Sequence, residues 1–84
     1  MDNDIIKIET TEVESSNVAS VGYHDDRNIL SIEMLNGHIY YYIDIPRAHF
    51  NIMMRYNKEG VRISSIGSYL RLFIYGKYRY TRVN

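Results

Sequence analysis

Cysteine and tryptophan are both absent from this chain of 84 residues, which has a single proline. Without cysteine, no disulfide framework, thiolate zinc site, iron–sulfur cluster or thiol nucleophile can form. No apolar run approaches the about 20 residues that a membrane helix requires, and the N-terminus, MDNDIIKIETTEVESS, lacks the basic and apolar regions of a signal peptide. We therefore expect a cytoplasmic protein without a membrane partner.

The residues that could support catalysis or hold a metal are few. His24, Asp25 and Asp26 form a His–carboxylate cluster, but they fall at a predicted turn, where adjacent side chains diverge. His38 and His49 match no known ligand spacing. We expect no enzyme activity, no metal and no cofactor.

Acidic and basic residues are separated along the chain, although the formal net charge is zero. Residues 1–42 contain eight acidic and two basic residues, and residues 43–84 contain two acidic and eight basic residues. Such a division is typical of a surface for nucleic acid or an acidic partner. The alternative is that the two halves pack together and attract each other, because charge that is local in sequence need not be local in space.

Alternating apolar residues predict three antiparallel strands, at residues 18–24, 29–35 and 38–44. The turn-forming residues 25–28 separate the first two, and Asn36-Gly37, the strongest short hairpin signal, separates the last two. Alternation from residue 18 puts Val18, Ser20 and Gly22 on one face and Val21 on the other. Residues 1–12 are expected to be an arm or, through residues 5–9, an edge strand, preceding a single domain over residues 13–84.

The apolar spacing becomes helical after Pro46, which suits the first turn of a helix with Asp44 as its cap. Residues 50–56 continue this spacing, and residues 57–60 are predicted to form a loop.

A second helix is predicted to begin at Ser64 or Ser65 as its cap and to end at Gly76 in the left-handed conformation. Its apolar face comprises Ile66, Tyr69, Leu70, Phe73 and Ile74. The predicted fold class is therefore α+β, with a three-stranded meander followed by two short helices packed on one face. Residues 77–83 are a short last strand or an ordered tail.

Tyr40, Tyr41 and Tyr42 follow the hairpin turn, and the length of that turn decides which face each takes. A two-residue turn places Tyr41 on the apolar face of the preceding strand. A three-residue turn, with Gly37 as a bulge, places Tyr40 and Tyr42 there instead.

Three segments, VESSNVASVGY, LSIEMLNGHIYYYIDIP and SIGSYLRLFIYGKYRY, resemble the KTSC domain in their order and spacing. This domain is found at the C-terminus of some lysyl-tRNA synthetases and as small stand-alone proteins. The resemblance covers roughly residues 13–83. The matching positions are Ser15, Ser16, Gly22, Tyr23, Tyr40, Tyr42, Ile45, Pro46, Ser65, Gly67, Ile74 and Tyr78.

The resemblance implies that most of these positions are structural, namely Ser15, Ser16, Gly22, Tyr23, Tyr40, Tyr42, Pro46, Ser65 and Gly67, together with Asn36 and Gly37. RNA binding is the function that has been suggested for the family. The chain departs from the family pattern in two places. Met34 occupies a position where an aromatic residue is usual, and the segment between Phe50 and Ser65 is longer than the family norm. The longer segment bears on the geometry between the two helices, around residues 57–63.

The last part of the chain interleaves tyrosines with basic residues, a pattern typical of surfaces for single-stranded nucleic acid. A base stacked on an aromatic ring contributes about 1–3 kcal/mol to binding. The alternative is that these tyrosines pack internally and the charges form a solvated rim. The candidate binding residues are Tyr41, Arg71, Tyr75, Lys77, Tyr78, Arg79, Tyr80 and Arg82.

These observations predict a non-catalytic binding module whose partner is RNA or another single-stranded nucleic acid. One alternative is a protein-interaction module, either a homodimer or a phage protein that binds a host factor. Another is a pocket of tyrosines and arginines that sequesters a nucleotide ligand.

Overall fold

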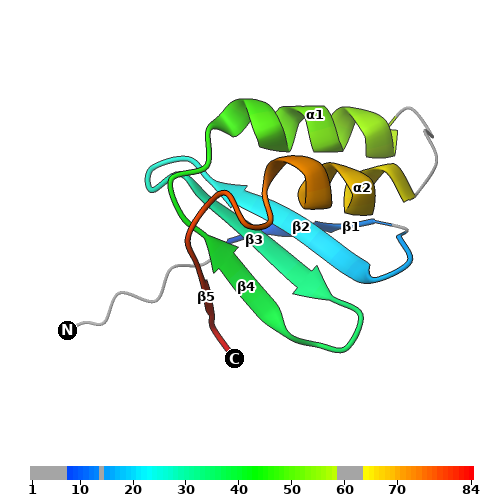
Figure 1. Ribbon diagram of the computed structural model, residues 1–84, viewed down its shortest axis with the longest axis horizontal. Helices are drawn as coiled ribbons and strands as arrows, with labels where there is room; N and C mark the ends of the chain where they lie inside the picture. Colours follow the sequence, from blue (N-terminus) through cyan, green and yellow to red (C-terminus); the bar gives the residue numbers. More distant parts are fainter. Residues whose placement is uncertain (1–7, 14, 59–63) are drawn as a thin grey trace.

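The computed structural model describes residues 8–13, 15–58 and 64–84, with the backbone alone for residues 56–58, 64 and 65. Figure 1 shows one sheet with two helices on one side of it. All strand pairs are antiparallel. The strands, in their order across the sheet, are β1 (Thr10–Glu12), β2 (Val18–His24), β3 (Ile29–Met34), β4 (Ile39–Tyr42) and β5 (Tyr80–Arg82).

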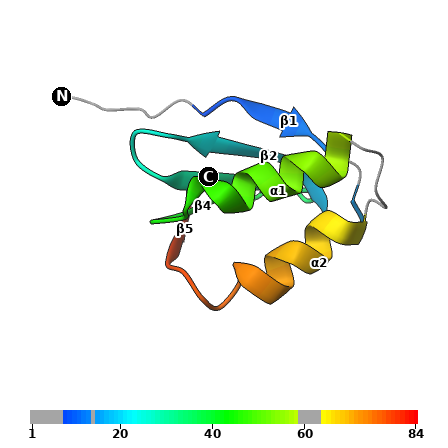
Figure 2. The same cartoon turned by 90° about the horizontal axis from the view of Figure 1, so that it is seen from above.

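The helices are α1 (Arg47–Lys58) and α2 (Ser64–Phe73). Figure 2, which views the molecule from above, shows them side by side over the sheet, and they contact each other. The predicted α+β class with both helices on one face is confirmed. The sheet itself is larger than the predicted meander, because it has five strands.

The two strands beyond the central three are the edges of the sheet. In β1, Thr10 lies opposite Gly22 of β2, and in β5, Tyr80 lies opposite Tyr42 of β4. An edge strand was expected at residues 5–9 but lies at Thr10–Glu12, and residues 1–7 are outside the described part. The last strand predicted within residues 77–83 is confirmed as Tyr80–Arg82.

The hairpin between β3 and β4 has a three-residue turn. The backbone N–H of Met34 donates to the carbonyl of His38 at 2.9 Å, and the N–H of Gly37 donates to the carbonyl of Met34 at 2.9 Å. Gly37 has a φ of 93°, in the left-handed region that glycine adopts without steric cost. The bulge alternative is therefore the one that the chain adopts.

This register decides the direction of the three consecutive tyrosines. Tyr40 lies opposite Ile32 and Tyr42 opposite Leu30, so both rings point to the side of the sheet that the helices cover. Tyr41 points to the other face.

A register shift in β2 brings Val18 to the helix side. The pairing of β2 with β3 shifts between Val18 and Ser20, so that Val18 lies opposite Met34 and Val21 opposite Ile32. Both valines are buried. The predicted alternation, which separated these two residues, was wrong because a β-bulge adds one residue to a strand and reverses the faces beyond it.

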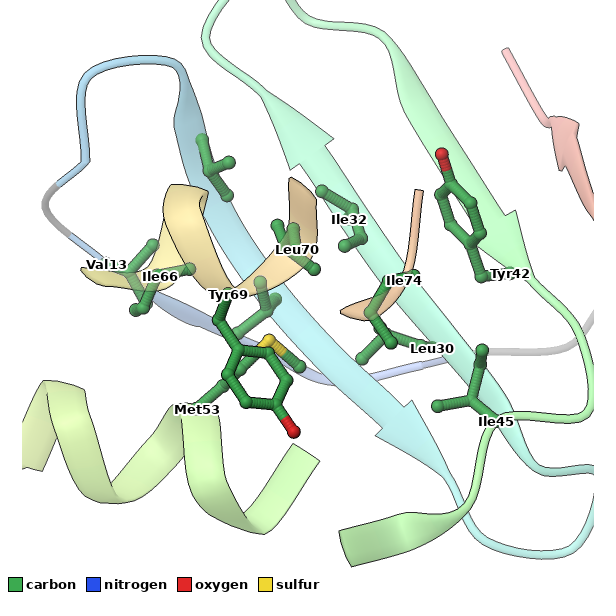
Figure 3. Close-up of a cluster of buried hydrophobic side chains, with 12 residues drawn as sticks. Val13, Leu30, Ile32, Tyr42, Ile45, Met53, Ile66, Tyr69, Leu70 and Ile74 are labelled. Atoms are coloured by element: carbon green, nitrogen blue, oxygen red, sulfur yellow. The ribbon is translucent and has the colours of Figure 1, made fainter. Parts of the chain in front are cut away.

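The core lies between the helices and the helix side of the sheet, as Figure 3 shows. Four of the five apolar positions predicted for α2 are buried, with Ile74 immediately after the helix end. Phe73 is 46% exposed and contacts the ring of Tyr69 at the border of that face. The core residues are Val13, Val18, Val21, Leu30, Ile32, Tyr42, Ile45, Met53, Ile66, Tyr69, Leu70 and Ile74.

The ends of the helices differ in part from the prediction. α1 begins directly after Pro46, but the expected cap Asp44 lies three residues before the first helical residue, with a φ of 61°. The predicted loop also begins later, because α1 continues to Lys58, and residues 59–63 are outside the described part. Gly76 has the predicted left-handed conformation, with a φ of 78°. The side chains of Ser64 and Ser65, the other predicted caps, are not described.

Gly22 and Tyr23, two positions of the family pattern, have clear structural reasons. A Cβ on Gly22 would lie 2.3 Å from the carbonyl oxygen of Glu9. Only glycine therefore lets the backbone of residues 8–10 pass so close to β2 at this position. The hydroxyl of Tyr23 lies within hydrogen-bond distance of the Ile45 carbonyl and of Asn28 Oδ1, which joins β2 to the segment before α1.

Candidate nucleic-acid interface

Four tyrosine rings gather on the helix side of β4 and β5, and we call them the tyrosine platform: Tyr40, Tyr42, Tyr75 and Tyr80. The ring centroid of Tyr80 lies 5.1 Å from that of Tyr42 and 5.7 Å from that of Tyr40. Tyr75, which follows α2, stacks on Tyr42 with a centroid distance of 5.7 Å. Figure 3 shows Tyr42 at the side of the core next to β5.

The rings of the platform differ in exposure. Tyr42 is 7% exposed and belongs to the core, whereas Tyr80 is 58% exposed. Tyr40 and Tyr75 are half-buried. The three-residue turn, one of the two alternatives for the hairpin, places Tyr40 and Tyr42 on the helix side, and Tyr80 is the most exposed ring of the platform.

Burial raises the pKa of two hydroxyls of the platform, those of Tyr42 and Tyr75. It raises the pKa of Tyr42 to about 12, and the neighbouring hydroxyls of Tyr75, Tyr80 and Tyr40 add to this effect. Burial also raises the pKa of Tyr75. The positive charge of Arg71 lowers this pKa, but burial has the larger effect. A tyrosine is already neutral near pH 7 at its ordinary pKa of 10.0, and burial holds these two further from ionisation, so the charge of this surface comes from its arginines.

Two arginines border the platform. Arg82 lies opposite Tyr40 and two residues after Tyr80, so its side chain is on the same face. Arg71 lies close enough to Tyr75 to influence its hydroxyl. Both are exposed, and among the described residues neither forms an ion pair with a carboxylate, since the pair found there is Arg47 with Asp25. Their charges are available to an anionic partner.

The other candidate binding residues lie elsewhere. Tyr41 lies opposite Ser31 and Thr81, on the face away from the helices. The carbonyl of Arg79 accepts a hydrogen bond from the N–H of Ile43, so the pairing of β5 with β4 extends to Arg79. Because side chains alternate along a strand, Arg79 lies on the same face as Tyr41.

Tyr78 turns towards α1, where its hydroxyl lies 3.4 Å from Nε2 of His49. Lys77 is exposed in the turn after α2. The structure thus brings together Arg71, Tyr75, Tyr80 and Arg82 from the predicted set, and it adds Tyr40 and Tyr42. The signal that could have found these two was the hairpin register, which the sequence left open.

The strand order separates the acidic and basic parts of the sheet. β1, with Glu12 and the preceding Glu9, forms one edge, and β5, with Arg82, forms the other. The charges of these two edges therefore lie apart, although elsewhere the two halves of the chain do attract each other, since Arg47 pairs with Asp25.

A cleft of about 110 Å³ adjoins the platform at Tyr75. It is much smaller than the about 300–1,000 Å³ of pockets that enclose whole small molecules, so it cannot enclose a nucleotide. No local pattern indicates this cleft, because its two walls are about 50 residues apart in the chain. It is lined by Ser16, Asn17, Val18, Gly67, Ser68, Arg71 and Tyr75.

Metal ligands do not cluster in the described part of the chain, where no three His, Asp or Glu side chains could hold an ion. None of the described helices is long and apolar enough to cross a membrane.

The family model for the KTSC domain matches residues 14–78. A crystal structure of a KTSC domain protein from Yersinia pestis is similar to this structure, with a TM-score of 0.76 and 24% sequence identity. The similarity covers 93% of this chain and 100% of that chain and shows a shared fold. No curated protein matches the chain. The predicted resemblance is thereby confirmed, and the chain belongs to the KTSC domain family.

Proposed function

We propose that this protein is a non-catalytic module that binds single-stranded nucleic acid on the tyrosine platform. The observation that carries the proposal is the exposed ring of Tyr80, held by contacts with Tyr40 and Tyr42 and bordered by Arg82. Proteins hold single strands with aromatic rings that stack on bases and basic residues that follow the phosphates, and every base has a face to stack.

The arrangement of the platform suits this role. A ring held by two neighbouring rings loses little conformational freedom when a base stacks on it. An unpaired arginine beside it can contact a phosphate without first giving up an internal ion pair. The acidic edge at β1 lies at the other end of the sheet, where it repels the strand least.

A salt titration of binding tests the proposal. Fluorescence anisotropy of a labelled single-stranded RNA of about ten nucleotides would be measured at several salt concentrations, with a single-stranded DNA and an RNA duplex compared. If two arginines each contact one phosphate, the slope of log K against log salt is about −1.4. Absent binding at low salt, or binding that does not depend on salt, would refute the proposal.

Two arginine variants give a matched comparison. Arg82→Gln should reduce the slope by about 0.7, the contribution of one phosphate contact to a single strand. Arg79→Gln removes the same charge from the opposite face of the sheet and should leave the slope unchanged. Equal effects of the two variants would show that the platform is not the binding surface.

A protein-interaction role is the second candidate, and one observation favours it. Leu72 and Phe73, adjacent at the end of α2, are 61% and 46% exposed. Exposed apolar residues that lie together are typical of protein contacts. Sedimentation of the protein at increasing concentration, with Leu72→Ser as the comparison, would show whether this pair joins two copies.

A further inference from the structure

The cleft beside Tyr75 has a lining that is suited to a small anion. Arg71 supplies a positive charge, Ser16 and Ser68 supply hydroxyls, and Asn17 supplies a side-chain amide. Among the residues that the structure describes, no carboxylate lines the cleft. Donor groups that converge without an acidic residue favour an anion over a cation.

The donors are largely uncommitted. The Oδ1 of Asn17 accepts a hydrogen bond from Ser16 at 3.1 Å, and the amide N–H₂ group of Asn17 remains as a donor. Arg71 forms no ion pair with the described carboxylates. A guanidinium group in this situation can form two parallel hydrogen bonds to the oxygens of one phosphate.

The size of the cleft fits one tetrahedral group. Its about 110 Å³ is several times the space that a single water requires, but less than half of a pocket for a drug-sized ligand. Gly67 contributes to this space, because a Cβ at that position would have contacts only at 3.5 Å with Ser15 Oγ and 3.8 Å with Asn17 Oδ1. The absence of a side chain there leaves the cleft open.

The cleft is continuous with the tyrosine platform. Tyr75 belongs to both, since it lines the cleft and stacks on Tyr42. We infer that the cleft is a phosphate-binding subsite in which Arg71, Ser68 and the Asn17 amide hold one phosphate of the strand that lies on the platform. This inference rests on the proposed function for the source of the phosphate, which is either a terminal monoester or an internal diester.

The test uses the backbone amide signals of the ¹⁵N-labelled protein, with inorganic phosphate and with oligonucleotides that carry either a 5′-phosphate or a 5′-hydroxyl. Inorganic phosphate should shift the amides of Gly67, Ser68 and Arg71, while chloride at the same ionic strength should not. A 5′-phosphate that strengthens binding about tenfold or more identifies the terminal monoester. Equal binding of the two oligonucleotides, with the same three amides shifted, identifies an internal phosphate.

Two variants examine the cleft without disturbing the core. Gly67→Ala places a methyl group in the cleft within ordinary contact distances, so the fold should be retained while the phosphate-dependent shifts are lost. Arg71→Gln should weaken phosphate binding about tenfold, as expected when a charge-assisted contact is lost. Arg55→Gln, which removes the charge of another exposed helical arginine outside the cleft, is the matched control.

The outcomes separate this inference from the proposed function. Phosphate shifts at the cleft without any oligonucleotide binding would support the subsite and refute the nucleic-acid function. Oligonucleotide binding that shifts the signals of Tyr80 and Arg82 but none at the cleft would support the function and overturn the subsite. Phosphate binding that survives both Gly67→Ala and Arg71→Gln would also overturn it.

Discussion

The ring of Tyr75 stacks on the ring of Tyr42 with centroids 5.7 Å apart and planes inclined at 30°. This contact joins the chain that follows α2 to β4, the strand beside the β5 edge of the sheet. The ring of Tyr42 also contacts that of Tyr80 in β5, with centroids 5.1 Å apart. One buried ring therefore fixes the position of two others from separate parts of the chain, and the platform depends on the docking of α2 as well as on strand pairing.

Replacing the exposed ring of the platform should weaken nucleic-acid binding. Tyr80→Ala removes the stacking face and should cost about 1–3 kcal/mol of binding free energy. Tyr41→Ala removes a tyrosine from the opposite face and should leave binding unchanged. Anisotropy titrations of both variants, with circular dichroism to confirm folding, make the measurement. A larger loss for Tyr41→Ala would place the interface on the other face.

Two glycines of the family pattern should respond oppositely to alanine. In Gly22→Ala the new Cβ would meet the Glu9 carbonyl oxygen at 2.3 Å, so β1 must move, at a cost of about 1–3 kcal/mol in unfolding free energy. In Gly67→Ala the new Cβ has ordinary contacts inside α2, where alanine is favoured over glycine by up to about 1 kcal/mol. Urea denaturation gives both values, and a stable Gly22→Ala would contradict the close crossing of residues 8–10.

Two leucines of α2 give a matched test of the core. Leu70 is fully buried, and Leu70→Ala should lower the free energy of unfolding by about 2–5 kcal/mol through lost burial and the cavity left behind. Leu72 is 61% exposed, and Leu72→Ala should change the free energy of unfolding by no more than about 0.5 kcal/mol. Equal losses in urea denaturation would mean that α2 docks through another face.

The raised pKa of Tyr42 predicts a loss of stability in alkali. Burial raises its pKa in the folded state to about 12, above the ordinary tyrosine value of 10.0. Between these two pH values the folded state binds more protons than the unfolded state, so the free energy of unfolding decreases as pH rises from about 10 to about 12. Below pH 10 the contribution is fully present.

Tyr42→Phe tests the assignment of this effect to one hydroxyl. The variant keeps the ring and its stacking but has no group to ionise, so the decrease in stability between pH 10 and 12 should become smaller. Tyr41→Phe is the control, and its denaturation curves should follow those of the unchanged protein. An unaltered pH dependence in Tyr42→Phe would assign the alkaline transition to other groups.

Much of the fold could be predicted from local patterns. The bounds of β2 and the left-handed Gly76 match the expectation, because alternation and glycine placement are set by the geometry of a few neighbouring residues. Asp44 shows the limit of such reasoning. A residue that can cap a helix was available, but the backbone turns there with a positive φ and the helix begins three residues later.

The candidate site was less predictable, because it depends on pairings over long distances in the chain. Tyr75 and Tyr80 were identified from their basic neighbours, but nothing local indicated that Tyr40 and Tyr42 lie against them. Arg79 and Arg82 are three residues apart, so a strand puts them on opposite faces, but only the observed register of β5 shows that Arg82 is the one on the helix side.

The amino-acid sequence by itself determined the family, the α+β class, the central hairpins and the apolar face of α2, since each follows from spacing along a short segment. The tertiary structure decided the faces. A three-residue turn at Gly37 and a bulge after Val18 each shift a strand by one residue, and such a shift moves every following side chain to the other side of the sheet. For that physical reason the tyrosine platform and the cleft beside it became visible only in three dimensions.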